Sequence, residues 1–201
     1  MIKNVVFDFG QVLIRFEPKY MVGKYVTDAR DAALLETVVF DRLYWDRLDS
    51  GTITNEEVIE RCCSRLPQRL HEVAKTIYCN WIYNIPEIEG MHELVCEIKE
   101  RFGVRVFLLS NISTYFAEHA GEFPVLREFE KCIFSAVCGY VKPSPQIFAH
   151  LCAECGIEAA ETVFIDDSRI NVKGAEDFGI KGYLFDGNAE KLRKYLFDLL
   201  Q

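Results

Sequence analysis

The chain has 201 residues, half of them hydrophobic, which is enough apolar material for one substantial core or a core with a smaller appendage. Its 23 Lys and Arg against 31 Asp and Glu give a net charge of -8, which argues against nucleic acid or an anionic membrane as the main partner. No uninterrupted apolar run reaches the roughly 18 residues that a membrane-spanning helix needs. A phosphorylated ligand would therefore have to be held by local positive groups.

The eight cysteines are scattered through apolar segments, and no signal peptide precedes them. This usage predicts free core thiols in a reducing cytoplasm. The pair Cys152 and Cys155 forms the one CxxC motif. It falls in a predicted helix without a second pair at zinc spacing, so a structural role is the preferred interpretation.

The first predicted element is a strand over Val5, Val6 and Phe7, and it delivers Asp8 at its end. These β-forming residues show no polar alternation, which is typical of a parallel strand buried on both faces. Ligands of open α/β sheets bind at the C-terminal ends of the strands, where Asp8 would lie. From these residues alone, a turn aspartate before Gly10 is an equal alternative.

A long helical tract follows from about residue 18 to about residue 83, with apolar residues spaced three and four apart. Thr54 and Glu57 have the spacing of a capping box, and Gly51 marks a turn just before it. The tract predicts a four- or five-helix insert between the first strand and the rest of the sheet. Its apolar face is compatible with packing on the core or on a second subunit.

From about residue 87 the chain alternates between helix and strand. The pattern predicts strands over 104–109, 132–137, 162–165 and 182–185, with helices over 91–98, from about 114, over 145–155 and over 189–200. Such alternation predicts right-handed crossovers and an α/β fold, a Rossmann-like parallel sheet with helices on both faces.

Polar side chains stand at or soon after the ends of four predicted strands, and parallel strands bring such ends to one edge of the sheet. The residues are Asp8, Ser110, Asn111, Lys142, Asp166 and Asp167. Three converging carboxylates repel one another unless a cation lies between them, and Mg²⁺ prefers oxygen ligands of this kind. A phosphate on that metal would face the hydroxyl of Ser110 and the ammonium of Lys142, and Asp8 would be free to attack phosphorus.

Each of these residues also has a simpler interpretation. Ser110 and Asn111 could cap the next helix, Lys142 could be a solvated loop lysine, and Asp166 with Asp167 could cap the helix near residue 170. The catalytic interpretation is preferred because all of the simpler ones would have to hold together.

The segments Phe7-Asp8, Leu109-Ser110-Asn111, Val141-Lys142-Pro143 and Ile165-Asp166-Asp167 resemble the four motifs of the haloacid dehalogenase-like (HAD) hydrolases. The resemblance implies a nucleophile at Asp8, phosphoryl contacts from Ser110 and Lys142, and Mg²⁺ held by Asp8, Asp166, Asp167 and the Gly10 carbonyl. Asn111, next to Ser110, is a further expected phosphate-binding residue. The resemblance further implies a catalytic core of residues 1–14 and 88–201 with a helical cap over 15–87. The start of the chain also resembles the α-D-glucose-1-phosphate phosphatase subgroup, and a small phosphorylated metabolite is the expected partner.

Phosphatases that the chain resembles usually carry a second aspartate two residues after the nucleophile, where this sequence has Gly10. Loss of a general acid typically costs about 10²–10⁴ in rate. The leaving group could be good enough to need little protonation, as in a sugar 1-phosphate or an acyl phosphate, or Glu17 or a cap residue such as Asp46 could supply the proton. Two further alternatives are a 2-haloacid dehalogenase, disfavoured by the acidic pair, and a catalytically weak protein that binds phosphorylated metabolites.

Several other residues have open roles. Phe16, Tyr44 and Trp45 belong either to a cap pocket or to the core, and Arg15 and Arg47 are candidates for gripping the substrate. Asn171 is expected to orient a metal-bound water or an acid, or else to serve the first turn of its helix. The four histidines, at positions 71, 92, 119 and 150, lie in helical stretches without ligand spacing.

Overall fold

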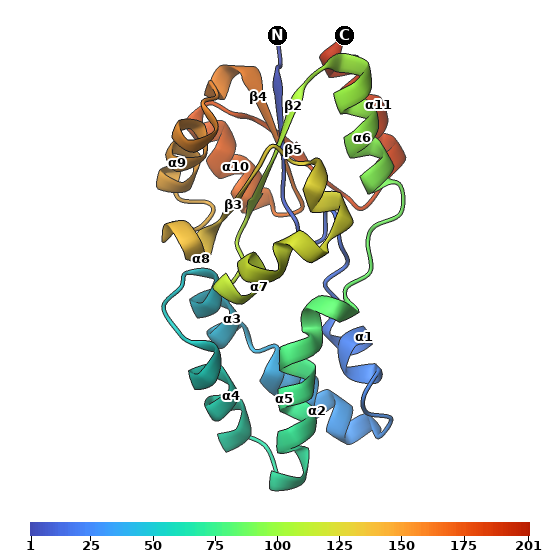
Figure 1. Ribbon diagram of the computed structural model, residues 1–201, viewed down its shortest axis with the longest axis vertical. Helices are drawn as coiled ribbons and strands as arrows, with labels where there is room; N and C mark the ends of the chain where they lie inside the picture. Colours follow the sequence, from blue (N-terminus) through green and yellow to red (C-terminus); the bar gives the residue numbers. More distant parts are fainter.

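The computed structural model describes residues 1–201 and is built on a five-stranded parallel sheet with the order β3-β2-β1-β4-β5 (Figure 1). The strands are β1 (Asn4–Phe7), β2 (Arg105–Ser110), β3 (Lys131–Phe134), β4 (Thr162–Asp166) and β5 (Lys181–Leu184). The first strand is central, and its Val6 is in register with Phe107 of β2 and Phe164 of β4. The chain therefore reverses its direction of strand addition beside β1, which is where α/β sheets open a ligand crevice. The predicted Rossmann-like fold is confirmed.

Helices cover both faces of the sheet (Figure 1). One face carries α6 (Met91–Phe102) and α11 (Ala189–Leu200), and the other carries α9 (Pro145–Cys155) and α10 (Arg169–Phe178). Residues of β1 alternate between the two resulting cores: Val5 and Phe7 belong to a buried cluster of 44 residues, and Val6 to a cluster of 12. Both faces of β1 are thus apolar, which explains why its sequence shows no alternation.

The helical tract forms a lobe beyond the C-terminal edge of the sheet (Figure 1). It comprises α1 (Pro18–Gly23), α2 (Ala29–Val39), α3 (Arg42–Asp49), α4 (Asn55–Ser64), η1 (Gln68–Leu70), α5 (His71–Asn80) and η2 (Trp81–Asn84). The two chain segments that enter and leave the lobe pair with each other, since Arg15 N–H donates to Pro86 O at 2.8 Å and Ile88 N–H to Leu13 O at 2.8 Å. The division at 14/15 and 87/88 into core and cap stays a prediction, and this pairing supports it.

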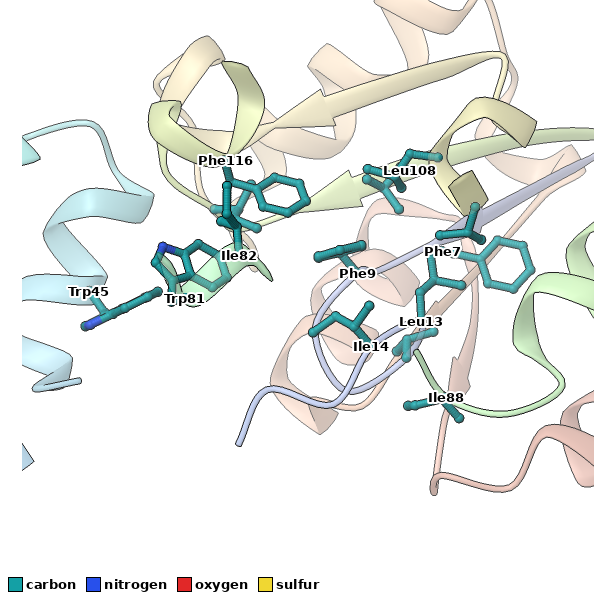
Figure 2. Close-up of a cluster of buried hydrophobic side chains, with 14 of the residues drawn as sticks. Phe7, Phe9, Leu13, Ile14, Trp45, Trp81, Ile82, Ile88, Leu108 and Phe116 are labelled. Carbon is teal, nitrogen blue, oxygen red and sulfur yellow. The ribbon is translucent and has the colours of Figure 1, made fainter. Parts of the chain in front are cut away.

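An apolar bridge joins the lobe to the sheet (Figure 2). Phe9, just after β1, packs on Phe116 with ring centroids 4.6 Å apart, and Phe116 stacks on Trp81 of η2 at 5.9 Å. Trp81 in turn meets Trp45 of α3 at 5.1 Å. Because these rings are buried and continuous, the lobe is held over the end of the sheet by hydrophobic contact.

Local sequence signals agree with most element bounds. The predicted capping box opens α4: Glu57 N–H donates to Thr54 Oγ1 at 3.2 Å, and Thr54 N–H donates to Glu57 Oε2 at 3.2 Å. Helices α9 and α11 have the predicted limits. The remaining elements are α7 (Thr114–His119), α8 (Ser135–Cys138), η3 (Ala120–Glu122), η4 (Pro124–Glu128) and η5 (Ala159–Glu161).

The predicted strand over 132–137 is wrong in its second half. Strand β3 ends at Phe134, and Ser135 begins the short helix α8. The buried Ser135 Oγ accepts a hydrogen bond from Ile112 N–H at 2.9 Å, and Gly139, with φ of 77°, donates its N–H to Ser135 O at 2.8 Å. These contacts favour a helical turn closed by a left-handed glycine over the β-propensity of the sequence.

No helix of the chain is both long enough and apolar enough to cross a membrane. All eight cysteines are free thiols, and Cys152 and Cys155 lie on α9 as predicted.

Candidate active site

A cavity of about 520 Å³ lies where the C-terminal edge of the sheet meets the helical lobe. Both parts of the chain line it. The sheet side contributes Asp8, Gly10, Ser110, Asn111, Lys142, Asp167 and Asn171, and the lobe side contributes Phe16, Arg42, Trp45, Asp49 and Trp81. The cavity therefore gathers the residues that the sequence placed at or soon after strand ends, except for Asp166, which is fully buried and bound to Lys142.

Asp8 follows β1 and is 8% exposed. Its Oδ1 accepts a hydrogen bond from Phe9 N–H at 2.7 Å and lies 2.7 Å from the Lys142 ammonium nitrogen. Its Oδ2 accepts no hydrogen bond. Burial, together with the charge of Asp166, raises the pKa of Asp8 to about 7 although Lys142 opposes the shift. One carboxylate oxygen is fixed and the other is left available.

Lys142 is buried, so the solvated-loop interpretation is wrong. Its Nζ lies 2.7 Å from Asp8 Oδ1, donates to Asp166 Oδ2 at 2.8 Å and donates to Leu109 O at 3.0 Å. Burial works to lower the pKa of this amine, but the two carboxylates outweigh it and raise the pKa above its ordinary value. The group is therefore a fixed cation facing the cavity.

The two adjacent acids at the end of β4 differ in exposure. Asp166 is fully buried, and its Oδ1 accepts from Ser168 N–H at 2.7 Å and from Asn171 Nδ2 at 3.2 Å. Asn171 therefore orients an acid, one of the roles expected for it. Asp167 is exposed toward the cavity, and burial and the neighbouring Asp166 charge raise its pKa.

The three carboxylates fit a hard cation. Ligand oxygens of Asp8, Asp166 and Asp167 all lie within 4.8 Å of one another, with Lys142 as the ammonium bonded to two of them. The carbonyl of Gly10 accepts no hydrogen bond from the protein and is free to bind a metal. An all-oxygen set of this kind suits Mg²⁺.

Ser110 is the last residue of β2 and Asn111 follows it, and their side chains make different contacts. The Ser110 side chain is buried at the cavity wall and makes no hydrogen bond within the protein. Asn111 is engaged with Lys142, since its Nδ2 donates to Lys142 O at 3.0 Å and its Oδ1 accepts from Lys142 N–H at 2.8 Å. Neither residue caps α7, because Ser113 does so by accepting from Phe116 N–H at 3.3 Å.

Some predicted substrate contacts lie outside the cavity. Arg15 and Glu17 are exposed and do not line it, and Arg47 donates to Thr52 O at 3.0 Å. Asp46 is exposed and pairs with Arg42 at 2.6 Å. Tyr44 does not line the cavity, and its hydroxyl accepts a hydrogen bond from Arg65 at 3.0 Å. Phe16 and Trp45 do line the cavity.

The sequence interpretation missed Arg42, Asp49 and Trp81. Arg42, Trp45 and Asp49 share one face of α3 at the spacing i, i+3 and i+7, and this spacing is the signal that would have found the two charged residues. Burial is the largest cause that raises the pKa of Asp49 to about 7, with Asp46 and Asp8 adding to it against Arg42 and Lys142.

A parallel sheet whose central strand presents a buried aspartate, held by a lysine and backed by two further acids, defines an α/β enzyme with a carboxylate-rich active site. The sequence matches the haloacid dehalogenase-like hydrolase family over residues 2–179, and the chain belongs to that family. It is a hydrolase.

Two curated relatives are phosphatases by name. D-ribitol-5-phosphate phosphatase of Bacteroides thetaiotaomicron is 24% identical, covering 94% of this chain and 95% of the relative. Sesquiterpene phosphatase astK of Aspergillus oryzae is 26% identical, covering 90% of this chain and 88% of the relative. The two names differ in substrate, and the predicted likeness to glucose-1-phosphate phosphatases stays a prediction.

A solved HAD family enzyme of Bacteroides thetaiotaomicron, crystallised in complex with magnesium and inorganic phosphate, has the same fold. Its TM-score is 0.68 at 23% identity, covering 94% of this chain and 96% of that chain.

Proposed function

We propose that the chain is a Mg²⁺-dependent phosphatase that hydrolyses a small phosphomonoester through an aspartyl-phosphate on Asp8. The observation that carries the proposal is the state of the Asp8 carboxylate. Its Oδ1 is fixed by Phe9 N–H and Lys142, while its Oδ2 has no protein partner and the residue lines the cavity. A carboxylate positioned in this way can attack phosphorus without first breaking a hydrogen bond at the attacking oxygen.

Two neighbouring groups would hold the phosphoryl oxygens. The unpartnered hydroxyl of Ser110 can donate one hydrogen bond, and the fixed ammonium of Lys142 supplies positive charge. Asn111 supports this arrangement by holding the backbone of Lys142: its side chain bonds both the N–H and the carbonyl oxygen of that residue.

The metal would be held by Asp8, Asp166, Asp167 and the carbonyl of Gly10. When bound, Mg²⁺ would neutralise charge on the carboxylates and on the phosphoryl group. This carboxylate set gives no advantage to a haloacid dehalogenase, because halide departs without a metal.

The lobe side of the cavity would contact the part of the substrate that does not react. Phe16, Trp45 and Trp81 give it an apolar aromatic wall, and Arg42 and Asp49 add charged groups. The lobe acts as a cap that excludes water during reaction. A cavity of about 520 Å³ accommodates a small metabolite, and a sugar 1-phosphate is the substrate class first indicated by the sequence.

The test is phosphate release from sugar 1-phosphates, sugar 6-phosphates, nucleotides and acyl phosphates, each with Mg²⁺ and with EDTA. We expect turnover that requires Mg²⁺ and that disappears in Asp8→Asn while the circular dichroism spectrum is unchanged. Trapping of ³²P on the wild type but not on Asp8→Asn would support the covalent step. Chloride release from 2-chloropropionate, with no phosphate release, would instead assign a dehalogenase, and binding of phosphorylated sugars without turnover would assign a binding protein.

A further inference from the structure

The cavity lacks an acid at the position where the resemblance leads one to expect it. A Cβ built on Gly10 meets no atom within 4 Å outside its two chain neighbours, so close packing does not require a glycine here. An alkoxide leaving group nevertheless needs a proton as its bond to phosphorus breaks.

Few acids are in a place to supply it. The carboxylates that line the cavity belong to Asp8, Asp49 and Asp167. Asp8 is the proposed nucleophile and Asp167 a proposed metal ligand, so Asp49 is the one cavity carboxylate without a proposed role. The two donors expected from the sequence, Glu17 and Asp46, do not line the cavity.

Asp49 is held over the site by its backbone. Ser135 Oγ donates to Asp49 O at 2.5 Å and accepts from Ile112 N–H at 2.9 Å, two residues beyond Ser110. Gly51, at φ of 68°, approaches so closely that an added Cβ would lie 2.9 Å from Ala136 O. The last turn of α3 is therefore fixed on α8 of the sheet-bearing part.

The Asp49 side chain is left uncommitted by these contacts. It forms no ion pair and accepts no hydrogen bond, although Arg42 lines the same cavity and pairs with Asp46 instead. The charged groups that act on it come from three directions: Arg42 and Asp46 on its own helix, Asp8 after β1, and Lys142. Their balance with burial raises its pKa to about 7, which suits a group that must both give and take a proton near neutrality.

We propose that Asp49 is the general acid and base of this enzyme, supplied by the helical lobe in place of the residue missing at Gly10. The proposal rests on the phosphatase function proposed above. Asp8 Oδ2 bonds to phosphorus as the ester P–O bond breaks, and the departing oxygen takes the proton of the Asp49 carboxyl to become the alcohol. The Asp49 carboxylate then takes a proton from the water that attacks phosphorus, and the acyl-phosphate P–O bond breaks to free Asp8 and inorganic phosphate.

The experiment compares wild type, Asp49→Asn, Asp49→Glu and Glu60→Gln with Mg²⁺ on 4-nitrophenyl phosphate, a series of less activated aryl phosphates, and alkyl phosphates. Glu60→Gln is the matched control, because it removes an exposed carboxylate of the lobe, on α4, that does not line the cavity. We expect Asp49→Asn to lose about 10²–10⁴-fold on alkyl phosphates and to depend steeply on leaving-group pKa. With 4-nitrophenyl phosphate it should release one equivalent of nitrophenol per enzyme in a burst and then turn over slowly as the aspartyl-phosphate accumulates.

Asp49→Glu retains a carboxyl group and should restore part of the alkyl phosphatase rate without the burst, and Glu60→Gln should behave like the wild type. An equal loss on every substrate, or no loss at all, would overturn the role of Asp49 while the wild-type turnover upholds the phosphatase function. Absence of phosphate release by the wild type from every substrate would overturn both proposals together.

Discussion

The buried ammonium of Lys142 gives the sharpest stability prediction. In Lys142→Met the hydrophobic stem is retained, but Asp8 and Asp166 lose the cation that lies 2.7 Å and 2.8 Å from them. Removal of one partner from a buried ion pair costs about 3–5 kcal/mol, because an uncompensated charge is left behind. Against a typical total of about 5–15 kcal/mol, the loss of unfolding free energy in EDTA should be large.

Urea denaturation at pH 7.5 followed by circular dichroism measures the effect, and the urea dependence should keep its slope. Lys173→Met is the matched control, since it breaks a pair with Asp177 in which both side chains are 64% exposed and should change little. The double variant Asp8→Asn/Lys142→Met should be more stable than Lys142→Met, because one of the stranded carboxylates is gone. A loss no greater than that of the control, or no recovery in the double variant, would refute the view that Lys142 balances these two acids.

Three further predictions concern the lobe and its acid. Gly10→Asp introduced into Asp49→Asn should recover at least about tenfold in alkyl phosphate hydrolysis, because a Cβ at Gly10 meets no packed atom and the added carboxyl would again offer a proton; an unchanged rate would contradict this. Ser135→Ala should lose about 1–3 kcal/mol in urea by leaving Ile112 N–H without an acceptor, and should slow alkyl more than nitrophenyl phosphate hydrolysis; equal slowing would argue against an effect on Asp49. Because the folded-state pKa of Asp49 is about 7 and its ordinary value 3.8, its contribution to stability is fully present below pH 3.8 and is lost as pH rises through 7. In a urea series, the free energy of unfolding of Asp49→Asn relative to wild type should therefore increase as the pH rises from 4 to 7. A difference that does not change with pH would show that the pKa of this carboxyl is not perturbed.

The fold could be predicted because its signals are local. The apolar run before Asp8 marks a strand covered on both faces, and the alternation of strands and helices specifies a parallel sheet. The ends of β1 and β2 then bring Asp8 and Ser110 together without any knowledge of side-chain packing, and the segment after α8 adds Lys142. The miss after Phe134 has a tertiary cause, since Ser135 turns into a helix to bind Ile112 and Asp49, which are distant in the sequence.

The lobe side of the cavity resisted prediction for the same reason. Which face of α3 meets the cavity depends on how Trp45 packs against Trp81 and, through Phe116, on the sheet. Asp46 and Asp49 are both aspartates of α3, and the sequence gives no reason to prefer one as a site residue. The packing of α3 leaves Asp46 in an exposed ion pair and places Asp49, without a partner, at the cavity.

If Asp49 supplies the proton, the chemistry depends on the docking of the lobe. An acid two residues after the nucleophile belongs to the same loop as Asp8 and is present whether the lobe is docked or not. An acid on α3 is held at the cavity by contacts between the lobe and the sheet-bearing part, among them the hydrogen bond from Ser135 Oγ to Asp49 O. Proton transfer would then be confined to the closed arrangement, in which the aromatic wall excludes water and the substrate is enclosed. Selection of the leaving group and its protonation would thus be performed by the same helix, which carries Arg42, Trp45 and Asp49 on one face.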